Sequence, residues 1–283
     1  MDQAQRLREI VEQTMTQNDA RVIAISSGKG GVGKTNISVN LAIALSRLGK
    51  KVTIIDADLG LSNVDVLFGV LTKYNLVHVL NDAVRIQDIV VKGPNNINIV
   101  SGGSGIIDLA DIDDLKLEQL ILSLGYFNSI SDYILLDTGA GIGKNVKSFV
   151  SYASELIVVV TPDPTSITDA YALIKNVVPS EGIKIKLIVN RVESNSEGEE
   201  VFSKLSQTVR RFLQLEIENL GYIFDDSDVK RAVRKQVPLL TAYPRSLASK
   251  AIENIAFNIE NNSHFSKAEN GFRSFLQRLI RRI

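Results

Sequence analysis

The sequence predicts a single α/β domain, with a doubly wound parallel sheet and helices on both of its faces. First, the 283 residues are 45% hydrophobic and 23% charged, so the chain can bury one sizeable core. Second, apolar runs of strand length recur along the chain with helical stretches between them, as in parallel α/β sheets. Third, a glycine-rich turn joins the first expected strand, 21–26, to a helix at 36–48. The other expected strands are 51–56, 96–100, 133–137, 155–160, 184–189 and 220–224.

The glycine-rich turn at 28–35 matches the phosphate-binding pattern G-x-x-x-x-G-K-[ST]. Its glycines allow backbone N–H groups to surround phosphate oxygens, and the following helix adds its positive N-terminal dipole. We expect Lys34 to reach the β- and γ-phosphates and the Thr35 hydroxyl to hold Mg²⁺. The sequence therefore predicts a nucleotide-binding protein, with the loop residues Gly28, Lys29, Gly30, Gly31, Val32, Gly33, Lys34, Thr35 and Asn36.

Carboxylates follow two of the other expected strands. The strand 51–56 ends in Asp56, with Asp58 two residues later, and the strand 133–137 ends in Asp137. Ligands of open α/β sheets bind at the carboxyl ends of the strands, so these side chains are expected to face the phosphate crevice. An apolar run that ends in an acid is the Walker B pattern, which places Asp137 at the water shell of the Mg²⁺ ion.

The strand 184–189 is followed by Asn-Arg-Val-Glu, where guanine-binding proteins have N-K-x-D. The aspartate of that motif accepts hydrogen bonds from guanine, whereas an asparagine can pair with N6 and N7 of adenine. We therefore expect ATP rather than GTP, with Asn190 and Arg191 at the base.

Composition narrows the range of functions. The formal net charge is zero, so no overall field attracts the chain to nucleic acid. The absence of cysteine is consistent with a reducing cytoplasm and excludes an iron–sulfur cluster held by thiolates. No run of about 18 apolar residues is present, and the first residues are polar, so neither a membrane span nor a signal peptide is expected.

A second lysine, Lys29, stands near the start of the loop in the run Lys-Gly-Gly-Val-Gly-Lys-Thr. This run resembles the deviant Walker A motif of the MinD/ParA ATPases. The resemblance implies a homodimer in the ATP state, in which Lys29 reaches the partner's phosphates and acts in catalysis with Lys34. It also implies that Asp58 orients the attacking water and that Asp56 lies near the Mg²⁺ shell. Without the resemblance, Lys29 would be interpreted as a solvated surface lysine.

Residues 2–15 place an apolar stripe at helical spacing, and the polar stretch 16–20 separates it from the first strand. The start resembles the DQAxxLR motif of the flagellar MinD-like ATPases of the FlhG (YlxH/FleN) type. That resemblance implies a helix that activates FlhF, a signal-recognition-type GTPase, with Gln3 orienting water in the GTPase site. A helix docked on its own domain is the alternative. The residues predicted to bind the partner are Asp2, Gln3, Ala4, Leu7 and Arg8.

Residues 261–271 read as a linker, and an apolar face at helical spacing follows at 272–283. The opposite face carries four arginines and no acid, which is typical of a helix that lies in a membrane surface. We expect a cytoplasmic protein bound peripherally to the anionic inner face of the cell membrane; a helix docked on the core is the alternative. The residues predicted to enter the membrane are Phe272, Phe275, Leu276, Leu279, Ile280 and Ile283.

The motifs predict three regions: an activator helix and linker at 1–20, an ATPase domain at 21–260, and a linker and membrane helix at 261–283. The resemblance implies an ATPase switch that controls flagellar number and placement, with the FlhF-type GTPase and flagellar switch or basal-body proteins as partners. Two related functions stay open: a cell-division MinD, which lacks the DQAxxLR helix, and a ParA-type DNA-partitioning ATPase. The second needs a basic surface for DNA, whereas the arginines here gather in the tail, so nucleic acid is not an expected partner. A scaffold that binds ATP without turnover is a further alternative.

Overall fold

The structure is a computed structural model that describes residues 20–58, 63–81, 83–103, 125–143, 146–147, 149–150, 153–177 and 183–261. The loop at 28–36 and the predicted site residues after the second, fifth and seventh strands lie within this set. The residues predicted to bind a partner near the N-terminus, and those predicted to bind membrane at 272–283, lie outside it.

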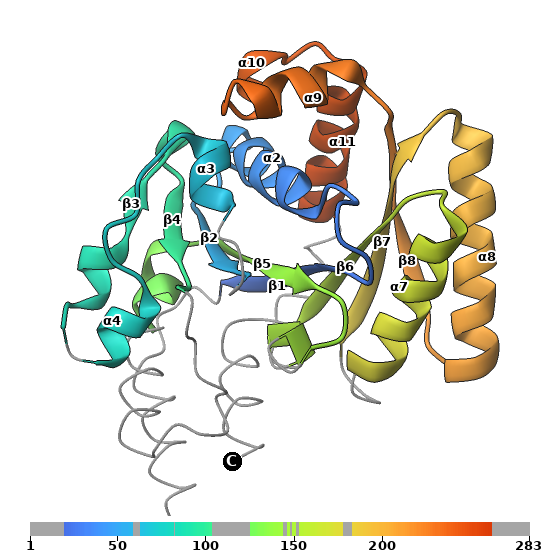
Figure 1. The fold of residues 1–283 in the computed structure, drawn as a ribbon, viewed down its shortest axis with the longest axis horizontal. Helices are drawn as coiled ribbons and strands as arrows, with labels where there is room; N and C mark the ends of the chain where they lie inside the picture. Colours follow the sequence, from blue (N-terminus) through green and yellow to red (C-terminus); the bar gives the residue numbers. More distant parts are fainter. Residues whose placement is uncertain are drawn as a thin grey trace, which may run out of the picture.

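The described strands form one eight-stranded sheet in the order β3-β4-β2-β5-β1-β6-β7-β8 (Figure 1). Neighbouring strands are parallel except β3 and β4, which are antiparallel at one edge. From β1 the chain passes to β2 on one side of the sheet, and β6, β7 and β8 are later added on the other side. Ligands of such sheets bind outside the carboxyl ends of the strands where the order reverses. The strands are β1 (Arg21–Ser27), β2 (Val52–Ala57), β3 (Val91–Lys92), β4 (Asn98–Ser101), β5 (Tyr133–Ala140), β6 (Glu155–Val160), β7 (Lys184–Val192) and β8 (Ile217–Phe224).

Helices cover both faces of the sheet, which confirms the predicted fold class (Figure 1). Along β1, Ile23 and Ile25 pack in one hydrophobic cluster with α2 and α11, whereas Val22 and Ala24 pack with α7 and α8 on the other face. Every residue of β1 is buried, as expected of a parallel strand covered on both sides. None of the described helices is long and apolar enough to cross a membrane. The helices are α2 (Lys34–Arg47), α3 (Val64–Phe68), α4 (Leu76–Leu80), α7 (Pro164–Val177), α8 (Asn195–Leu213), α9 (Ser227–Arg234), α10 (Leu239–Ala242) and α11 (Leu247–Asn261), with 3₁₀ turns at Ile86–Ile89 and Pro94–Asn96.

The strand β8 is longer than the sequence predicts. It begins at Ile217, three residues before the predicted start at 220. Ile217 is buried and pairs with Ile185, whereas Glu218 and Asn219 are exposed. Because β8 lies at an edge of the sheet, polar residues are tolerated there, and they interrupt the apolar run on which the prediction depended.

A buried ion network fixes the end of the sheet that lies away from the glycine-rich loop. The Arg21 guanidinium donates to both carboxylate oxygens of Glu155, at 2.8 and 2.9 Å, and to the backbone oxygen of Ile259, at 2.8 Å. Lys186 Nζ lies 2.9 Å from the same carboxylate. Burial alone would raise the pKa of Glu155, but the two cations outweigh burial and leave that pKa below its ordinary value. The network ties the start of β1 to the end of α11, so the first and last described elements meet at the amino end of this central strand.

Candidate functional site

The glycine-rich loop runs from the end of β1 to the start of α2, and two of its glycines leave no room for a side chain. A Cβ atom on Gly28 would lie 2.2 Å from the backbone carbonyl of Asp169 in α7. Gly33, the N-cap of α2, has a φ of 95°, and its Cβ atom would lie 2.6 Å from Asn190 Nδ2. The loop is therefore held between α7 and the end of β7, and it leads directly into a helix N-terminus that suits a phosphate.

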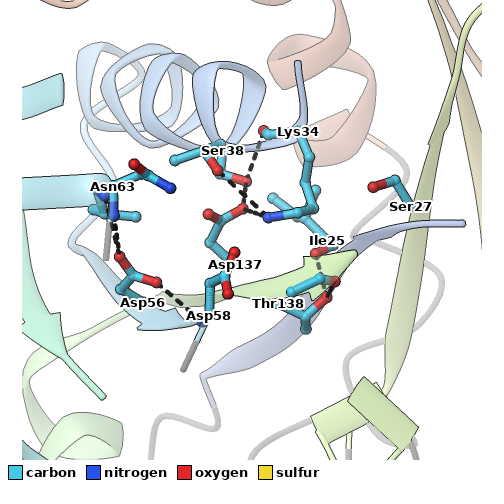
Figure 2. A network of polar contacts seen from close by, with 12 residues as sticks. Ile25, Ser27, Lys34, Ser38, Asp56, Asp58, Asn63, Asp137 and Thr138 are labelled. Atoms are coloured by element: carbon cyan, nitrogen blue, oxygen red, sulfur yellow. Dashed lines mark hydrogen bonds and ion pairs between the residues drawn. The ribbon is translucent and has the colours of Figure 1, made fainter. Parts of the chain in front are cut away.

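Lys34 and Asp137, from the two predicted motifs, meet beneath the loop (Figure 2). Lys34 Nζ lies 3.0 Å from Asp137 Oδ1, and both side chains are buried. The hydroxyl of Ser38, one turn further along α2, donates to the same oxygen at 2.7 Å. Sequence reasoning missed Ser38, because the hydroxyl and the carboxylate that it contacts are 99 residues apart in the chain.

The residues present suit a magnesium ion. Asp137 Oδ2 is buried and has no hydrogen-bond partner among the described residues. The Thr35 hydroxyl lies 3.4 Å from Lys34 Nζ, so the hydroxyl and the carboxylate share the same lysine neighbour. Carboxylate, hydroxyl and water oxygens are the ligands that Mg²⁺ prefers, so an unpaired carboxylate oxygen beside a hydroxyl fits the predicted metal site.

Asp56 has a structural role that the sequence did not reveal. Its Oδ1 atom accepts the backbone N–H of Asp58 at 3.0 Å, and its Oδ2 atom accepts those of Asn63 and Val64 at 3.0 and 3.1 Å (Figure 2). The carboxylate thereby caps α3 and fixes the backbone at the position of the predicted catalytic Asp58. Its proposed proximity to the Mg²⁺ shell remains a prediction.

Two cavities flank the loop. The first, of about 420 Å³, is lined by loop residues that include Lys34 and Thr35, by Asp58, and by apolar side chains of α3 and α9. Asp58 Oδ1 lies 3.5 Å from the point where a Cβ atom on Gly139 would stand, so its side chain borders the end of β5. The second cavity is smaller and is lined by Asn190, Arg191 and residues at the start of α9. The structure therefore places Lys34, Thr35 and Asp58 on one cavity and the predicted base residues on its neighbour.

Asn190 and Arg191 also bind the loop itself. Asn190 Nδ2 donates to the backbone oxygen of Val32 at 2.7 Å, and Arg191 Nη2 donates to that of Gly31 at 2.9 Å. Arg191 has a φ of 60°, and the register of β7 against β8 shifts between Asn190 and Val192, so the strand is bulged at this point. One amide hydrogen of Asn190 is thus hydrogen-bonded to the loop. Pairing of its other amide hydrogen and its oxygen with adenine remains a prediction.

Lys29 contacts residues at the start of α7 and does not line the phosphate cavity. Its Nζ atom lies 2.6 Å from Asp163 Oδ2 and 2.5 Å from Thr165 Oγ1, at the start of α7. The hydrogen bond from Lys29 is the main reason that the pKa of Asp163 falls to about 2. From sequence this segment reads only as a stiff turn that begins a helix, so the contact with the loop was not predicted.

Comparison with known proteins also indicates a P-loop nucleotide site. A family model described as ParA, NUBPL iron-transfer P-loop NTPase, matches residues 18–260. The antiactivator FleN of Pseudomonas aeruginosa is 38% identical over 271 residues, which cover 95% of this chain and 97% of FleN. The flagellum site-determining protein YlxH of Helicobacter pylori is 37% identical over 270 residues, which cover 94% of this chain and 91% of YlxH.

Solved structures show the same fold. The MinD cell division protein of Aquifex aeolicus matches with a TM-score of 0.66 and 29% identity, over 86% of this chain and 97% of that one. The septum site-determining protein MinD of Pyrococcus horikoshii, solved with Mg-ADP, matches with a TM-score of 0.68 and 25% identity, over 86% and 97% of the two chains. The chain therefore belongs to the ParA/MinD family of P-loop NTPases and is an ATPase of that family.

Proposed function

We propose that this ATPase is a switch that controls the number and placement of flagella. The observation that carries the proposal is its near full-length similarity to FleN and to YlxH, a flagellum site-determining protein. The match to FleN spans 271 residues and is longer than the segment 18–260 that the family model matches. Part of the chain outside the ATPase core is therefore shared with a flagellar relative. A septum site-determining MinD of Synechocystis matches over a similar length, so the proposal depends on the higher identity to FleN and YlxH, 38% and 37% against 34%.

The site geometry supports hydrolysis by residues with separate roles. Lys34, which is paired with Asp137 in this structure, turns toward the phosphates when ATP binds, because the several negative charges of the phosphates compete with the single carboxylate. Thr35 and Asp137 Oδ2, which has no hydrogen-bond partner among the described residues, would hold the Mg²⁺ ion. That ion, when bound, neutralises negative charge on the phosphates. Asp58, on the wall of the same cavity, orients the attacking water.

Two such subunits join around their nucleotides. In the dimer, Lys29 of each subunit reaches the phosphates bound by the other, and Lys34 holds its own. The position of Lys29 supports this proposal, because its side chain is directed away from the phosphate cavity of its own subunit. Hydrolysis then separates the subunits.

The two terminal segments connect the switch to its targets. Residues 1–20 bind the FlhF-type GTPase, 272–283 bind anionic membrane, and flagellar switch or basal-body proteins are further partners. The contact between Arg21 and Ile259 supports joint action, because it joins the first and the last described elements of the chain at the amino end of β1. The seven residues of β1, about 20 Å, separate this contact from the phosphate loop.

Two variants test the proposed cycle. Asp58→Ala is expected to bind ATP, lose about 10²-fold or more in phosphate release, and elute as a dimer in ATP. Lys29→Ala is expected to keep nucleotide affinity through Lys34 and to stay monomeric. Nucleotide titration, phosphate release and size-exclusion chromatography with light scattering give the three readouts. A monomeric Asp58→Ala protein with an ordinary turnover rate would contradict the roles assigned here.

Counting flagella tests the cellular role. Cells that carry only Asp58→Ala or only Lys29→Ala, at wild-type protein levels, should differ from the parent in flagellar number or position by electron microscopy. Normal flagella in both strains, with a changed septum position or plasmid loss instead, would point to the cell-division or DNA-partitioning alternative.

A further inference from the structure

Lys29 is bound within its own subunit by two acceptors that the proposed cycle does not use. Asp163 Oδ2 and Thr165 Oγ1 lie 2.6 and 2.5 Å from its Nζ atom. Asp163 is itself fixed, because its other oxygen accepts the Thr165 backbone N–H and hydroxyl, each at 2.9 Å. The acceptors are therefore a formed site for an ammonium group. We call these three side chains the lysine latch.

The latch competes with the proposed dimer contact. Asp163 and Thr165 use two of the three N–H donors of the ammonium group in this structure, and in the proposed dimer the same group turns to the phosphates of the second subunit. The Lys29 and Asp163 side chains are 39% and 44% exposed, so water can replace the contact when it opens. An ion pair this exposed is weak enough to open in every cycle, yet it biases Lys29 toward its own subunit.

We infer that Asp163 is a positioning residue that keeps Lys29 in its own subunit until ATP and a partner subunit compete for it. This inference rests on the trans role proposed above for Lys29. The low pKa of Asp163 means that its carboxylate is charged throughout the neutral range, so nucleotide and partner, rather than pH, release the lysine.

The size of the effect follows from the symmetry of the dimer. Removing one half-exposed ion pair changes an equilibrium by about threefold. Each dimer opens two latches, so the dimer dissociation constant changes by the square of that factor, about tenfold. Added salt screens the pair, so the difference from wild type is expected to shrink as salt rises.

Asp163→Asn is the variant that tests the latch. An asparagine carbonyl can still accept the Thr165 N–H and keep the start of α7, but it removes the charge that holds Lys29. Sedimentation velocity of the full chain with a non-hydrolysable ATP analogue should give a dimer dissociation constant about tenfold lower than wild type. Thr165→Val should change it in the same direction by less. Glu200→Gln, at an exposed acid of α8, controls for the change in net charge.

The outcomes separate this inference from the proposed function. If Lys29→Ala dimerises as well as wild type, the trans role fails and the latch fails with it. If Lys29→Ala is monomeric but Asp163→Asn has the wild-type dissociation constant, the latch alone is overturned. A weaker dimer in a normally folded Asp163→Asn protein would also overturn it, because Asp163 would then act within the dimer. Thermal unfolding of each variant confirms that the fold is intact.

Discussion

At the residue scale, Ser38 is placed to hold the Asp137 carboxylate when Lys34 turns to phosphate in the proposed cycle. Both groups contact Asp137 Oδ1 in the structure, and the Ser38 contact does not depend on Lys34. A hydrogen bond to a charged group contributes about 1.5–3 kcal/mol, so Ser38→Ala should raise the half-saturating Mg²⁺ concentration by about ten- to a hundredfold. Fluorescent ADP titrated with Mg²⁺ measures this without turnover. Ser38→Thr keeps a hydroxyl and should stay near wild type; an unchanged Mg²⁺ requirement in Ser38→Ala would remove the assigned role.

The same residues show how much of the site the sequence could reveal. Lys34 and Thr35 lie in a contiguous motif, and Asp137 ends an apolar run, so local pattern was sufficient to predict them. Ser38 and Asp163 depend on partners 99 and 134 residues away, which only the folded sheet brings into contact. The family resemblance places Asp56 near the Mg²⁺ ion. It does not indicate that Asp56 caps α3, because this helix has only five residues and no apolar periodicity of its own.

At the scale of elements, the loop and α7 pack without space for a methyl group at Gly28. Its Cβ atom would lie 2.2 Å from both the carbonyl carbon and oxygen of Asp169, and a helix backbone cannot move aside cheaply. Gly28→Ala should therefore destabilise the nucleotide-free protein by about 1–3 kcal/mol, as overpacking does. Gly30→Ala is the matched control, because a Cβ atom there meets nothing within 4 Å. Thermal unfolding compares the two; equal melting temperatures would mean that the loop is free to shift away from α7.

The ion network at the other end of the sheet gives a second prediction at this scale. Glu155 neutralises two buried cations, Arg21 and Lys186, so Glu155→Gln should cost about 3–5 kcal/mol of unfolding free energy. Glu218→Gln, at the half-exposed second partner of Lys186, should cost about 1 kcal/mol or less.

The difference in unfolding free energy between wild type and Glu155→Gln should become smaller in acid. The folded-state pKa of Glu155 is lowered, so its contribution is fully present above the unfolded value of 4.5 and is lost as pH falls toward the folded value. Urea unfolding at several pH values measures this difference. A difference in unfolding free energy that grows in acid would contradict the role given to the ionised Glu155 carboxylate in this network.

At the scale of the whole molecule, the fold class followed from the sequence but the strand order did not. Apolar runs alternating with helices indicate a doubly wound sheet, because parallel strands covered on both faces need little polar surface. The order depends on which strand edges meet, and β1 pairs with β5, more than 100 residues later, rather than with β2. That pairing sets Asp137 beside the loop and thereby forms the site.

The position at which α11 ends bears on how ATP could control the proposed membrane binding. The α11 helix ends at Asn261, and Ile259 is bound to Arg21, so the last described residues are fixed to the core. A single short amphipathic helix binds lipid weakly, because ordering it costs conformational entropy and only one face inserts. Each arginine near an anionic surface adds about 1 kcal/mol, which salt screens. A monomer is therefore expected to bind marginally.

In a dimer, the first tail already holds the protein at the membrane, so insertion of the second tail is an intramolecular step. This linkage can raise avidity by roughly 10²–10⁴ with no new contact. Wild type should pellet with anionic vesicles in ATP and poorly in ADP, whereas Phe275→Glu should pellet in neither, because a charge on the inserted face opposes burial. Lys29→Ala, with its tail intact, should behave in ATP as wild type does in ADP, which separates dimerisation from the tail itself. Equal pelleting of wild type in the two nucleotides would refute the avidity mechanism, and binding that is lost only on removing residues 1–20 would place the membrane contact at the other end of the chain.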